Sequence, residues 1–428
     1  MPYPRSRLVF PGRNAFRSVL ALCAFASAAA AAAMAEDYSQ WTFAREFSLD
    51  ASGLAQDLAG YPLLVRFGPD NSAFFAKALP KGADLRFSLP DGTHLAYQIE
   101  TWEPAQNAAT VWVRIPLVKA GQGARVRAHC GRPGAADSSD GAAVFRTAEG
   151  FQGIWHMQAS LEDATANRVR AMDSGGIASP AGHWGTARYF DNPDAYATQG
   201  KYLLLGNPAA LNFAGALTLS AWISWGRRDG HRIILCHGSS PGSSFETVLR
   251  IGESKDYRAG VWTGAAHYAA VAAPAADSAA WIHLGGAYTG KGWILYRNGE
   301  QVGALASDTN GAKPSPGSWR IGAQNTSAGV TRFFHGSIDE VRISNAARSA
   351  DWFKLDFATQ QAGSAAVHWD PATTLAGAGR GSLARRAAFR MRGGAPAYGF
   401  LPGEGIISPL GRSMGRQAFP AVLSMDKE

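Results

Sequence analysis

Short segments rich in Val, Ile, Phe, Tyr and Trp alternate with turn residues along most of the chain. Apolar and polar residues also alternate within many of these segments. In residues 109–115, Val111, Val113 and Ile115 share one face of an extended chain and the residues between them share the other. No stretch with helical periodicity separates the early segments, which argues against βαβ units and a dinucleotide-binding fold. The pattern predicts half-buried antiparallel sheet.

The predicted strands fall into two groups. The first group comprises residues 41–49, 61–67, 84–89, 93–101, 109–115 and 124–130. The second comprises residues 202–205, 216–225, 232–237, 247–251, 257–262, 281–288, 292–297, 301–305, 319–321 and 336–344. A link rich in Gly, Ser and Asp at residues 131–141 separates the groups and predicts a domain boundary. We therefore expect an all-β protein made of two β-sandwich domains, the second a jelly roll.

Local signals refine this picture at three places. Pro90 and Gly92 predict a turn between two early strands, and Asn298–Gly299 suits a two-residue type I′ hairpin. One helix is expected at residues 350–360, where Ser349 can cap the first turn and Gly363 follows the last.

Charge is distributed unevenly along the chain. The 428 residues carry 41 Lys and Arg against 33 Asp and Glu, a formal charge of +8. Residues 1–35 contribute +4 and residues 371–428 contribute +5, so residues 36–370 carry a net charge of −1. Because the basic residues are concentrated at the two ends, the folded region is unlike a nucleic-acid-binding surface.

The first 35 residues have the pattern of a secretory signal peptide. Four arginines precede an apolar segment at residues 19–33, and Ala33, Met34 and Ala35 supply a small-x-small cleavage motif. The apolar segment is shorter than the roughly 18 to 20 residues that span a bilayer. We expect cleavage after Ala35 and export to the periplasm or the cell surface.

Two cysteines, Cys130 and Cys236, remain after the signal peptide. Both lie at the ends of apolar strands, which favours buried thiols, although a single disulfide stays open as an alternative. No Cys/His cluster has zinc-site spacing.

The first group of strands resembles a known domain. Residues 82–87, 97–102 and 111–116 resemble an exported bacterial domain of unknown function that often lies on the periplasmic side of MotA/TolQ/ExbB-type proton channels. The resemblance implies a transport partner and a channel region after the second domain. Residues 371–428 contain no apolar segment of the roughly 18 residues needed to span a bilayer.

The second group resembles a LamG-like, concanavalin A-like jelly roll. The matching segments are residues 217–223, 281–284, 295–299 and 334–343, with residues 153–157 and 163–167 fitting its beginning. We therefore expect a signal peptide at 1–35, a sandwich domain of unknown function at 36–145, a LamG-like domain at 146–370 and a basic Gly/Ala/Arg-rich tail at 371–428. The tail is either disordered or a truncated or frameshifted gene end.

Concanavalin A-like folds include glycosidases, which need two carboxylates facing one cleft. The most suggestive neighbours are Asp339 and Glu340, but adjacent strand residues point to opposite faces. We expect these residues to order a strand end or to pair with Arg342 or Arg348.

Two other groups of residues are candidates for ligand binding. Asp191, Asn192 and Asp194 offer oxygen ligands for Ca²⁺ at a loop rim, with an Asx turn as the alternative. Aromatic residues near predicted strand ends can stack on sugar rings. They are Trp225, Tyr257, Trp262 and Tyr268.

These observations favour an exported, non-enzymatic binding protein for an envelope glycan or protein, working with a proton-channel transport system. No cofactor is required, Ca²⁺ is a candidate, and nucleic acid is not an expected partner. The alternatives are a concanavalin A-like glycoside hydrolase and a surface adhesin.

Overall fold

The computed structural model describes residues 36–238, 245–326 and 329–371, which fall within one compact unit. The predicted signal peptide and almost all of the predicted tail lie outside these residues. No helix in the described part of the chain is both long and apolar enough to cross a membrane.

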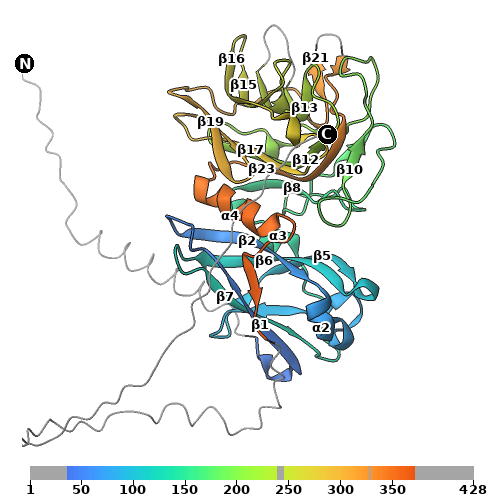
Figure 1. Ribbon diagram of the computed structural model, residues 1–428, viewed down its shortest axis with the longest axis vertical. Helices are drawn as coiled ribbons and strands as arrows, with labels where there is room; N and C mark the ends of the chain where they lie inside the picture. The colour runs from blue at the N-terminus through green and yellow to red at the C-terminus, as the bar shows by residue number, and fades with distance from the viewer. Residues whose placement is uncertain (1–35, 239–244, 327–328, 372–428) are drawn as a thin grey trace, which may run out of the picture. The chain divides into compact units, whose positions relative to one another are not determined.

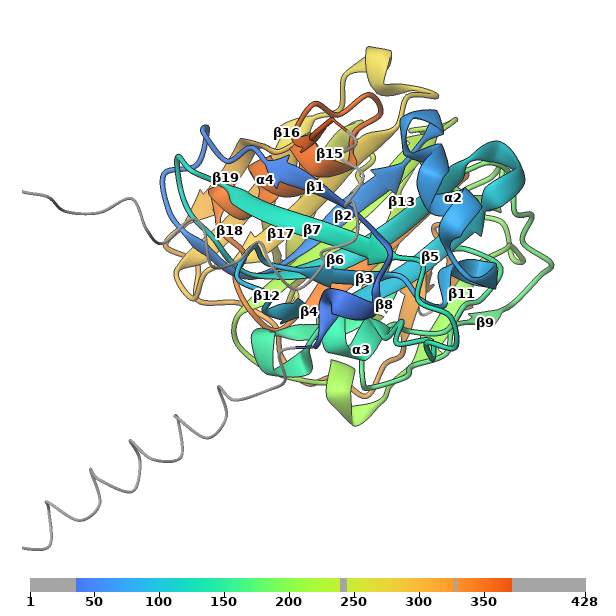
Figure 2. The same ribbon diagram turned by 90° about the horizontal axis from the view of Figure 1, so that it is seen from below.

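The first domain is built from two antiparallel sheets (Figures 1 and 2). One sheet has the order β24-β1-β7-β3-β4, and the other has the order β2-β6-β5. Their bounds are β1 (Phe43–Leu49), β2 (Leu58–Phe67), β3 (Arg86–Ser88), β4 (His94–Leu95), β5 (Tyr97–Glu103), β6 (Ala108–Val118), β7 (Ala124–Cys130) and β24 (Val367–Trp369). Pro62 is accommodated because β2 is an edge strand.

The second domain packs two larger sheets around one apolar core. One sheet has the order β10-β23-β12-β17-β18-β19, with β8 also paired to β23, and the other has the order β16-β15-β14-β13-β20-β11-β9. The strands of the first are β8 (Phe151–Trp155), β10 (Arg188–Phe190), β12 (Leu217–Trp225), β17 (Ile282–Tyr288), β18 (Gly292–Arg297), β19 (Glu300–Ala306) and β23 (Gly336–Ser344). The strands of the second are β9 (Met172–Asp173), β11 (Leu203–Gly206), β13 (Arg232–Gly238), β14 (Glu246–Ile251), β15 (Asp256–Trp262), β16 (Ala266–Ala272) and β20 (Trp319–Ile321). The predicted all-β fold class is confirmed.

The remaining elements are short. A separate hairpin joins β21 (Gln324–Thr326) to β22 (Gly329–Thr331). Two helices that the sequence did not predict, α2 (Ser72–Lys77) and α3 (Gly141–Val144), are too short to show a helical period. Single 3₁₀ turns occur at Tyr38–Gln40, Pro69–Asn71, Pro80–Gly82, Pro104–Gln106, Thr147–Glu149, Ala209–Leu211 and Ala275–Asp277.

The predicted helix α4 (Ala350–Gln360) is confirmed, including its cap. The Ser349 hydroxyl accepts a hydrogen bond from the Trp352 backbone N–H at 3.2 Å. The helix lies between the two domains (Figure 1). Trp352 packs edge-on against Tyr61 of β2, whereas Phe353 stacks on Tyr296 of β18 with 4.0 Å between ring centroids. Both sides of the helix are therefore used in packing.

The C-terminal end of the predicted second domain belongs to the first. Strand β24 lies inside the predicted range 146–370, yet it pairs with β1. Trp369 packs against Phe47 and Phe67 of the first domain, at centroid distances of 4.7 Å and 5.1 Å. The assignment of these last residues to the jelly roll was wrong because a strand can pair with one that is distant in sequence, as β24 does with β1.

The sheet β2-β6-β5 is buried on both faces, whereas the alternation in the sequence predicted burial on one. Val111 and Val113 point into the core of the first domain, and Trp112 between them is also fully buried. The second face packs against Trp222 of the second domain and Leu355 of α4. This second face carries the polar cluster described below.

Both cysteines are free, buried thiols, as the favoured interpretation predicted. Burial raises the pKa of Cys130 to about 12 and also raises that of Cys236. Both therefore behave as small apolar side chains.

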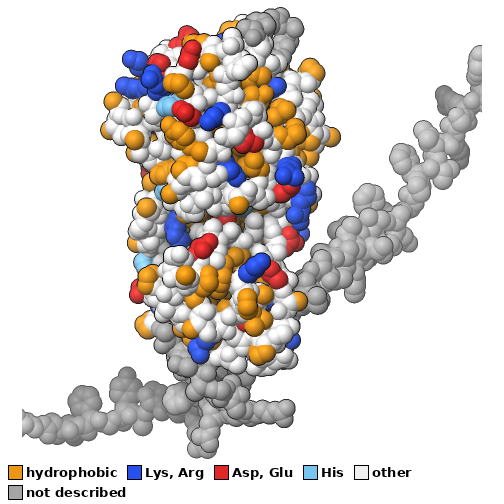
Figure 3. All heavy atoms as spheres, turned by 90° about the vertical axis from the view of Figure 1, so that its right-hand side faces the viewer, with side chains coloured by type: hydrophobic (Ala, Val, Ile, Leu, Met, Phe, Trp, Pro, Cys, Tyr) orange, Lys and Arg blue, Asp and Glu red, His pale blue; other side chains and the backbone are white. Residues whose placement is uncertain are grey.

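The face of the molecule shown in Figure 3 carries charges of both signs. On the face shown in Figure 3, basic and acidic side chains are interspersed. This agrees with the near-neutral charge of residues 36–370.

The two predicted turns are confirmed and allow a matched test. Asn298 and Gly299 both have positive φ, 50° and 82°, as a type I′ hairpin requires. A Cβ on Gly299 would meet the Phe357 Cβ of α4 at 3.1 Å, whereas one on Gly92, with φ of 90°, would meet nothing within 4 Å. Gly299 therefore combines a conformational requirement with a close approach.

We expect Gly92→Ala to lower the free energy of unfolding by about 1 to 2 kcal/mol, the conformational cost alone. Gly299→Ala should cost about 1 to 3 kcal/mol more because it also crowds α4. Urea denaturation of the two variants measures the difference. Equal losses would show that the hairpin tip does not press on the helix.

Candidate functional site

Two of the four aromatic residues predicted to stack on sugars lie in the core instead. Trp225 is 3% exposed and Tyr257 is 0% exposed. The Trp225 indole donates to the Tyr257 hydroxyl at 2.8 Å, and that hydroxyl donates to Asp277 at 2.8 Å. The prediction was wrong for these two because both side chains point from their strands into the space between the sheets.

Trp262 and Tyr268 remain partly exposed, on the neighbouring strands β15 and β16. Tyr268 lies beside two guanidinium groups, 4.8 Å from Arg250 and 5.8 Å from Arg258. Neither aromatic residue lines the pocket described next.

The predicted calcium residues line a pocket of about 720 Å³. Asn192 is buried, and its amide donates to the carbonyls of Lys201 and Phe334, both at 2.8 Å. Asp194 accepts from the backbone N–H of Tyr196 at 2.8 Å, which is the Asx turn considered as the alternative. Asp191 is exposed. The structure therefore leaves Asp191 as the least committed of the three oxygen donors.

The rest of this pocket combines polar and aromatic groups. Exposed Thr198 and Gln199 lie on one loop, and the half-buried ring of Tyr202 packs near Phe333 with 6.4 Å between centroids. A Cβ on Gly200 would come within 2.7 Å of the Phe333 ring, so glycine lets this loop lie directly on the aromatic wall. The volume is in the usual range for small-molecule sites.

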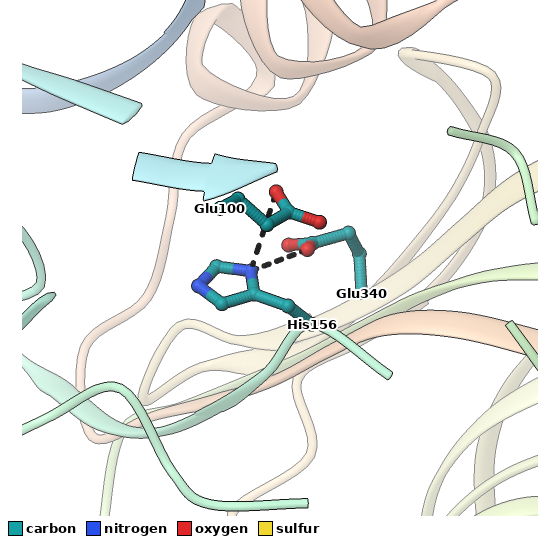
Figure 4. A group of neighbouring side chains, drawn as sticks. All are labelled: Glu100, His156 and Glu340. Carbon is teal, nitrogen blue, oxygen red and sulfur yellow. Dashed lines mark hydrogen bonds and ion pairs between the residues drawn. The ribbon is translucent and has the colours of Figure 1, made fainter. Parts of the chain in front are cut away.

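A second group of residues, not predicted as a site, lies where the two domains meet (Figure 4). Glu100 comes from β5, His156 follows β8, and Glu340 lies within β23. One side-chain ligand atom from each lies within 4.8 Å of the other two. The side chains of Glu100 and Glu340 are only 2% and 1% exposed, and we call these three residues the Glu–His–Glu cluster.

A β-bulge in β23 corrects the prediction that Asp339 and Glu340 point to opposite faces. In the pairing of β12 with β23, Ser220 lies opposite Arg342 and Trp222 lies opposite Asp339. Two steps along β12 therefore match three steps along β23, so β23 has one extra residue. Glu340 absorbs the change with φ of 46°. The flanking Ile338 and Val341 both face the jelly-roll core, and the two acids both lie outside it.

Hydrogen bonds fix each member of the cluster. His156 Nδ1 lies 2.5 Å from Glu340 Oε1 and 3.9 Å from Glu100 Oε2, and its Nε2 lies 3.2 Å from Gln98 Oε1. Glu100 accepts from the Trp112 indole at 2.7 Å and from the Gln158 amide at 2.7 Å. The cluster is thus held from both domains.

The electrostatics of the cluster differ among its acids. Burial raises the pKa of Glu100 to about 7, against the opposing effect of His156. Burial acts in the same direction on Glu340, but His156 and Arg342 together lower its pKa. Burial would lower the pKa of His156, yet Glu340 and Glu100 raise it. Asp339 has a pKa raised by burial and by the charges of Glu340 and Glu100.

Arg342 connects the cluster to helix α4. Its guanidinium donates to Glu340 Oε2 at 3.2 Å and to Asp356 Oδ1 at 3.0 Å. It also lies 4.7 Å from the Trp112 ring centroid. The predicted pairing of Glu340 with Arg342 is therefore confirmed.

A cavity of about 260 Å³ adjoins the cluster. Its lining includes Gln98, Glu100, His156, Gln158 and Asp163. Asp163 accepts from the backbone N–H groups of Ile154 and Thr165 at 2.9 Å and 2.8 Å, and so holds the chain beside His156 in place. Glu340 does not line the cavity, so the two glutamates do not face one cleft.

The sequence contains no spacing signal that would reveal this cluster. His156 lies 56 residues after Glu100, and Glu340 lies 184 residues after His156. All three fall within segments that carried the family resemblances, and only Glu340 was considered there for its chemistry, beside Asp339.

Comparison with protein families supports the two-domain resemblance. Residues 197–353 match the family described as concanavalin A-like lectin/glucanases superfamily, Laminin_G_3. Residues 81–159 match a domain of unknown function, DUF2341. The chain therefore contains a concanavalin A-like domain preceded by a DUF2341 domain. A search of curated proteins found no match.

Several solved structures are distantly similar. Domain 4 of AbnA, a GH43 extracellular arabinanase from Geobacillus stearothermophilus in complex with arabinotriose, is 18% identical over 49% of this chain and 98% of its own, with a TM-score of 0.39. The binding domain of Paraclostridial Mosquitocidal Protein 1 is 10% identical over 49% of this chain and 52% of its own, with a TM-score of 0.39. A Trypanosoma rangeli sialidase mutant displaying trans-sialidase activity is 12% identical over 62% of this chain and 45% of its own, with a TM-score of 0.37. At these TM-scores the similarities place no constraint on function.

We expect Arg342→Leu to lower the free energy of unfolding by about 3 to 5 kcal/mol, because Glu340 and Asp356 would lose a buried cationic partner. The matched control is Lys119→Ala, which removes an ion pair to Asp57 between side chains that are 53% and 41% exposed. That change should lower the free energy of unfolding far less than Arg342→Leu, because exposed ion pairs contribute little to stability. Chemical denaturation measures both, and similar small losses would mean that the buried pairs are not needed for stability.

Proposed function

We propose that this protein is an exported, non-enzymatic binding protein whose concanavalin A-like domain recognises a glycan in the 720 Å³ pocket. One observation carries the proposal: the pocket places exposed polar side chains beside aromatic rings. Sugars present hydroxyl groups around apolar ring faces, so such a lining can satisfy both.

Particular residues suit particular parts of a sugar. The Asp191 carboxylate can accept hydrogen bonds from hydroxyl groups, and the Gln199 amide can both accept and donate; both side chains are exposed at the pocket. The half-buried Tyr202 ring offers an apolar face. These contacts to a sugar require no metal, although the Asp191 and Asp194 carboxylates could also bind calcium.

The Glu–His–Glu cluster has one property of a glycosidase site, but its geometry supports the non-enzymatic part of the proposal. Glu100 and Glu340 differ in pKa as the two acids of a glycosidase do, which favours hydrolysis as the second candidate function. Glu340, however, is 1% exposed, is paired with Arg342 and does not line the cavity. A sugar could not reach both carboxylates.

We expect Tyr202→Ala to weaken glycan binding about tenfold or more, through loss of the ring face in the pocket. The ligand is first identified on a glycan array with the purified protein, and affinities are then measured by calorimetry. Trp262→Ala is the matched control, because Trp262 was a candidate from sequence and lies outside the pocket.

Three other outcomes would change the proposal. An array without any bound glycan favours a protein partner. Loss of binding in Trp262→Ala but not in Tyr202→Ala moves the site to β15 and β16. Chelator-sensitive binding restored by calcium, and weakened by Asp191→Asn, assigns calcium to the pocket.

Export and a transport partner form the rest of the proposal. The pattern of residues 1–35 supports export, and the resemblance of residues 82–87, 97–102 and 111–116 supports a role beside a MotA/TolQ/ExbB-type proton channel. The periplasm or the cell surface would be the place of action, and a surface adhesin remains the related alternative.

We expect the mature protein to begin at Glu36 and to be recovered outside the cytoplasm. Mass spectrometry of the protein from fractionated cells measures both. Ala35→Leu should leave the precursor uncut, because the cleaving enzyme needs a small residue at that position. Protein that retains Met1 in the cytoplasmic fraction would contradict export.

A further inference from the structure

The Glu–His–Glu cluster has no role in the proposed glycan pocket. Its His156 Nδ1 faces both carboxylates, at 2.5 Å from Glu340 Oε1 and 3.9 Å from Glu100 Oε2. We infer that Glu100, His156 and Glu340 bind one divalent transition-metal ion, with zinc the best match, between Nδ1 and the two carboxylates (Figure 4). This inference is independent of glycan binding.

The imidazole is oriented for ligation through Nδ1. Its Nε2 lies 3.2 Å from Gln98 Oε1, an acceptor, so Nε2 carries the hydrogen in the neutral ring. Nδ1 is then the nitrogen with a free lone pair. A metal-binding histidine usually donates its other ring N–H in this way.

Neighbouring donors orient both carboxylates. The Trp112 and Trp184 indoles donate to Glu100 at 2.7 Å and 3.2 Å. Arg342 donates to Glu340 Oε2 and leaves Oε1 directed at His156. Such outer hydrogen bonds hold metal ligands in position.

The charge balance leaves room for a dication. Arg342 is shared between Glu340 and Asp356, and His156 Nδ1 lies 2.5 Å from Glu340 and 3.9 Å from Glu100. Two buried carboxylates beside one imidazole can balance the two positive charges of a dication.

The donor set favours zinc over calcium. One imidazole nitrogen and two carboxylates suit zinc and its neighbours in the first transition series, whereas calcium prefers oxygen ligands throughout. The 260 Å³ cavity lined by Glu100 and His156 supplies an entry path and room for a water molecule as a further ligand. Such an ion would tie β5 of the first domain to β23 of the second.

The test uses the whole protein after treatment with a chelator and dialysis. Titration with zinc sulfate by calorimetry, followed by elemental analysis, should give one zinc per chain, and the Tm should rise with free zinc. Glu100→Gln and His156→Gln, which preserve size and hydrogen-bonding capacity, should each weaken zinc binding at least about 100-fold. Calcium at equal concentration should not compete.

The matched control is His267→Gln, because His267 Nδ1 lies 2.6 Å from Asp308 in a separate histidine–carboxylate pair. That variant should still bind one zinc with unchanged affinity. Should a cluster variant fail to fold, X-ray absorption of the zinc-loaded unsubstituted protein decides, with one imidazole and oxygen ligands expected. The inference would be overturned if the protein bound no zinc or if X-ray absorption showed a sulfur ligand. It would also be overturned if folded Glu100→Gln and His156→Gln bound zinc as tightly as the unsubstituted protein.

Discussion

The burial of the Arg342 charge constrains how the two domains meet. A guanidinium that is removed from water needs hydrogen-bonded anions around it, and here Glu340 of β23 and Asp356 of α4 supply them. The Trp112 ring of the first domain covers one side of the group at 4.7 Å. Strand β23, helix α4 and sheet β2-β6-β5 are therefore positioned by the needs of one side chain.

The bulge in β23 makes this arrangement possible. A regular strand would send either Asp339 or Glu340 into the jelly-roll core, where a carboxylate has no partner. The extra residue keeps Ile338 and Val341 in the core and turns both acids toward the first domain. A local irregularity in one strand therefore creates the polar side of the boundary between the domains.

The two domains are also joined by apolar packing that ignores chain order. Tyr61 and Val113 of the first domain share one buried cluster with Phe151 and Trp222 of the second domain and with Leu355 of α4. After the jelly roll, α4 and β24 return to the first domain. The 720 Å³ pocket, where we propose that a glycan binds, is lined by none of these residues, so the proposed binding site and the boundary between the domains use separate surfaces.

The sequence by itself determined the strands, turns and helix whose signals are local. Alternation placed most strands within a few residues, Asn298–Gly299 specified its hairpin, and Ser349 marked the start of α4. Strand β16 was missed because its alanine-rich sequence resembles no strand pattern. Only the tertiary structure decided which aromatic residues are buried and that Glu100, His156 and Glu340 meet, because those outcomes depend on long-range pairing and on a bulge that shifts the register. Side-chain chemistry can be read from sequence, whereas the proximity that gives it a use is created by packing.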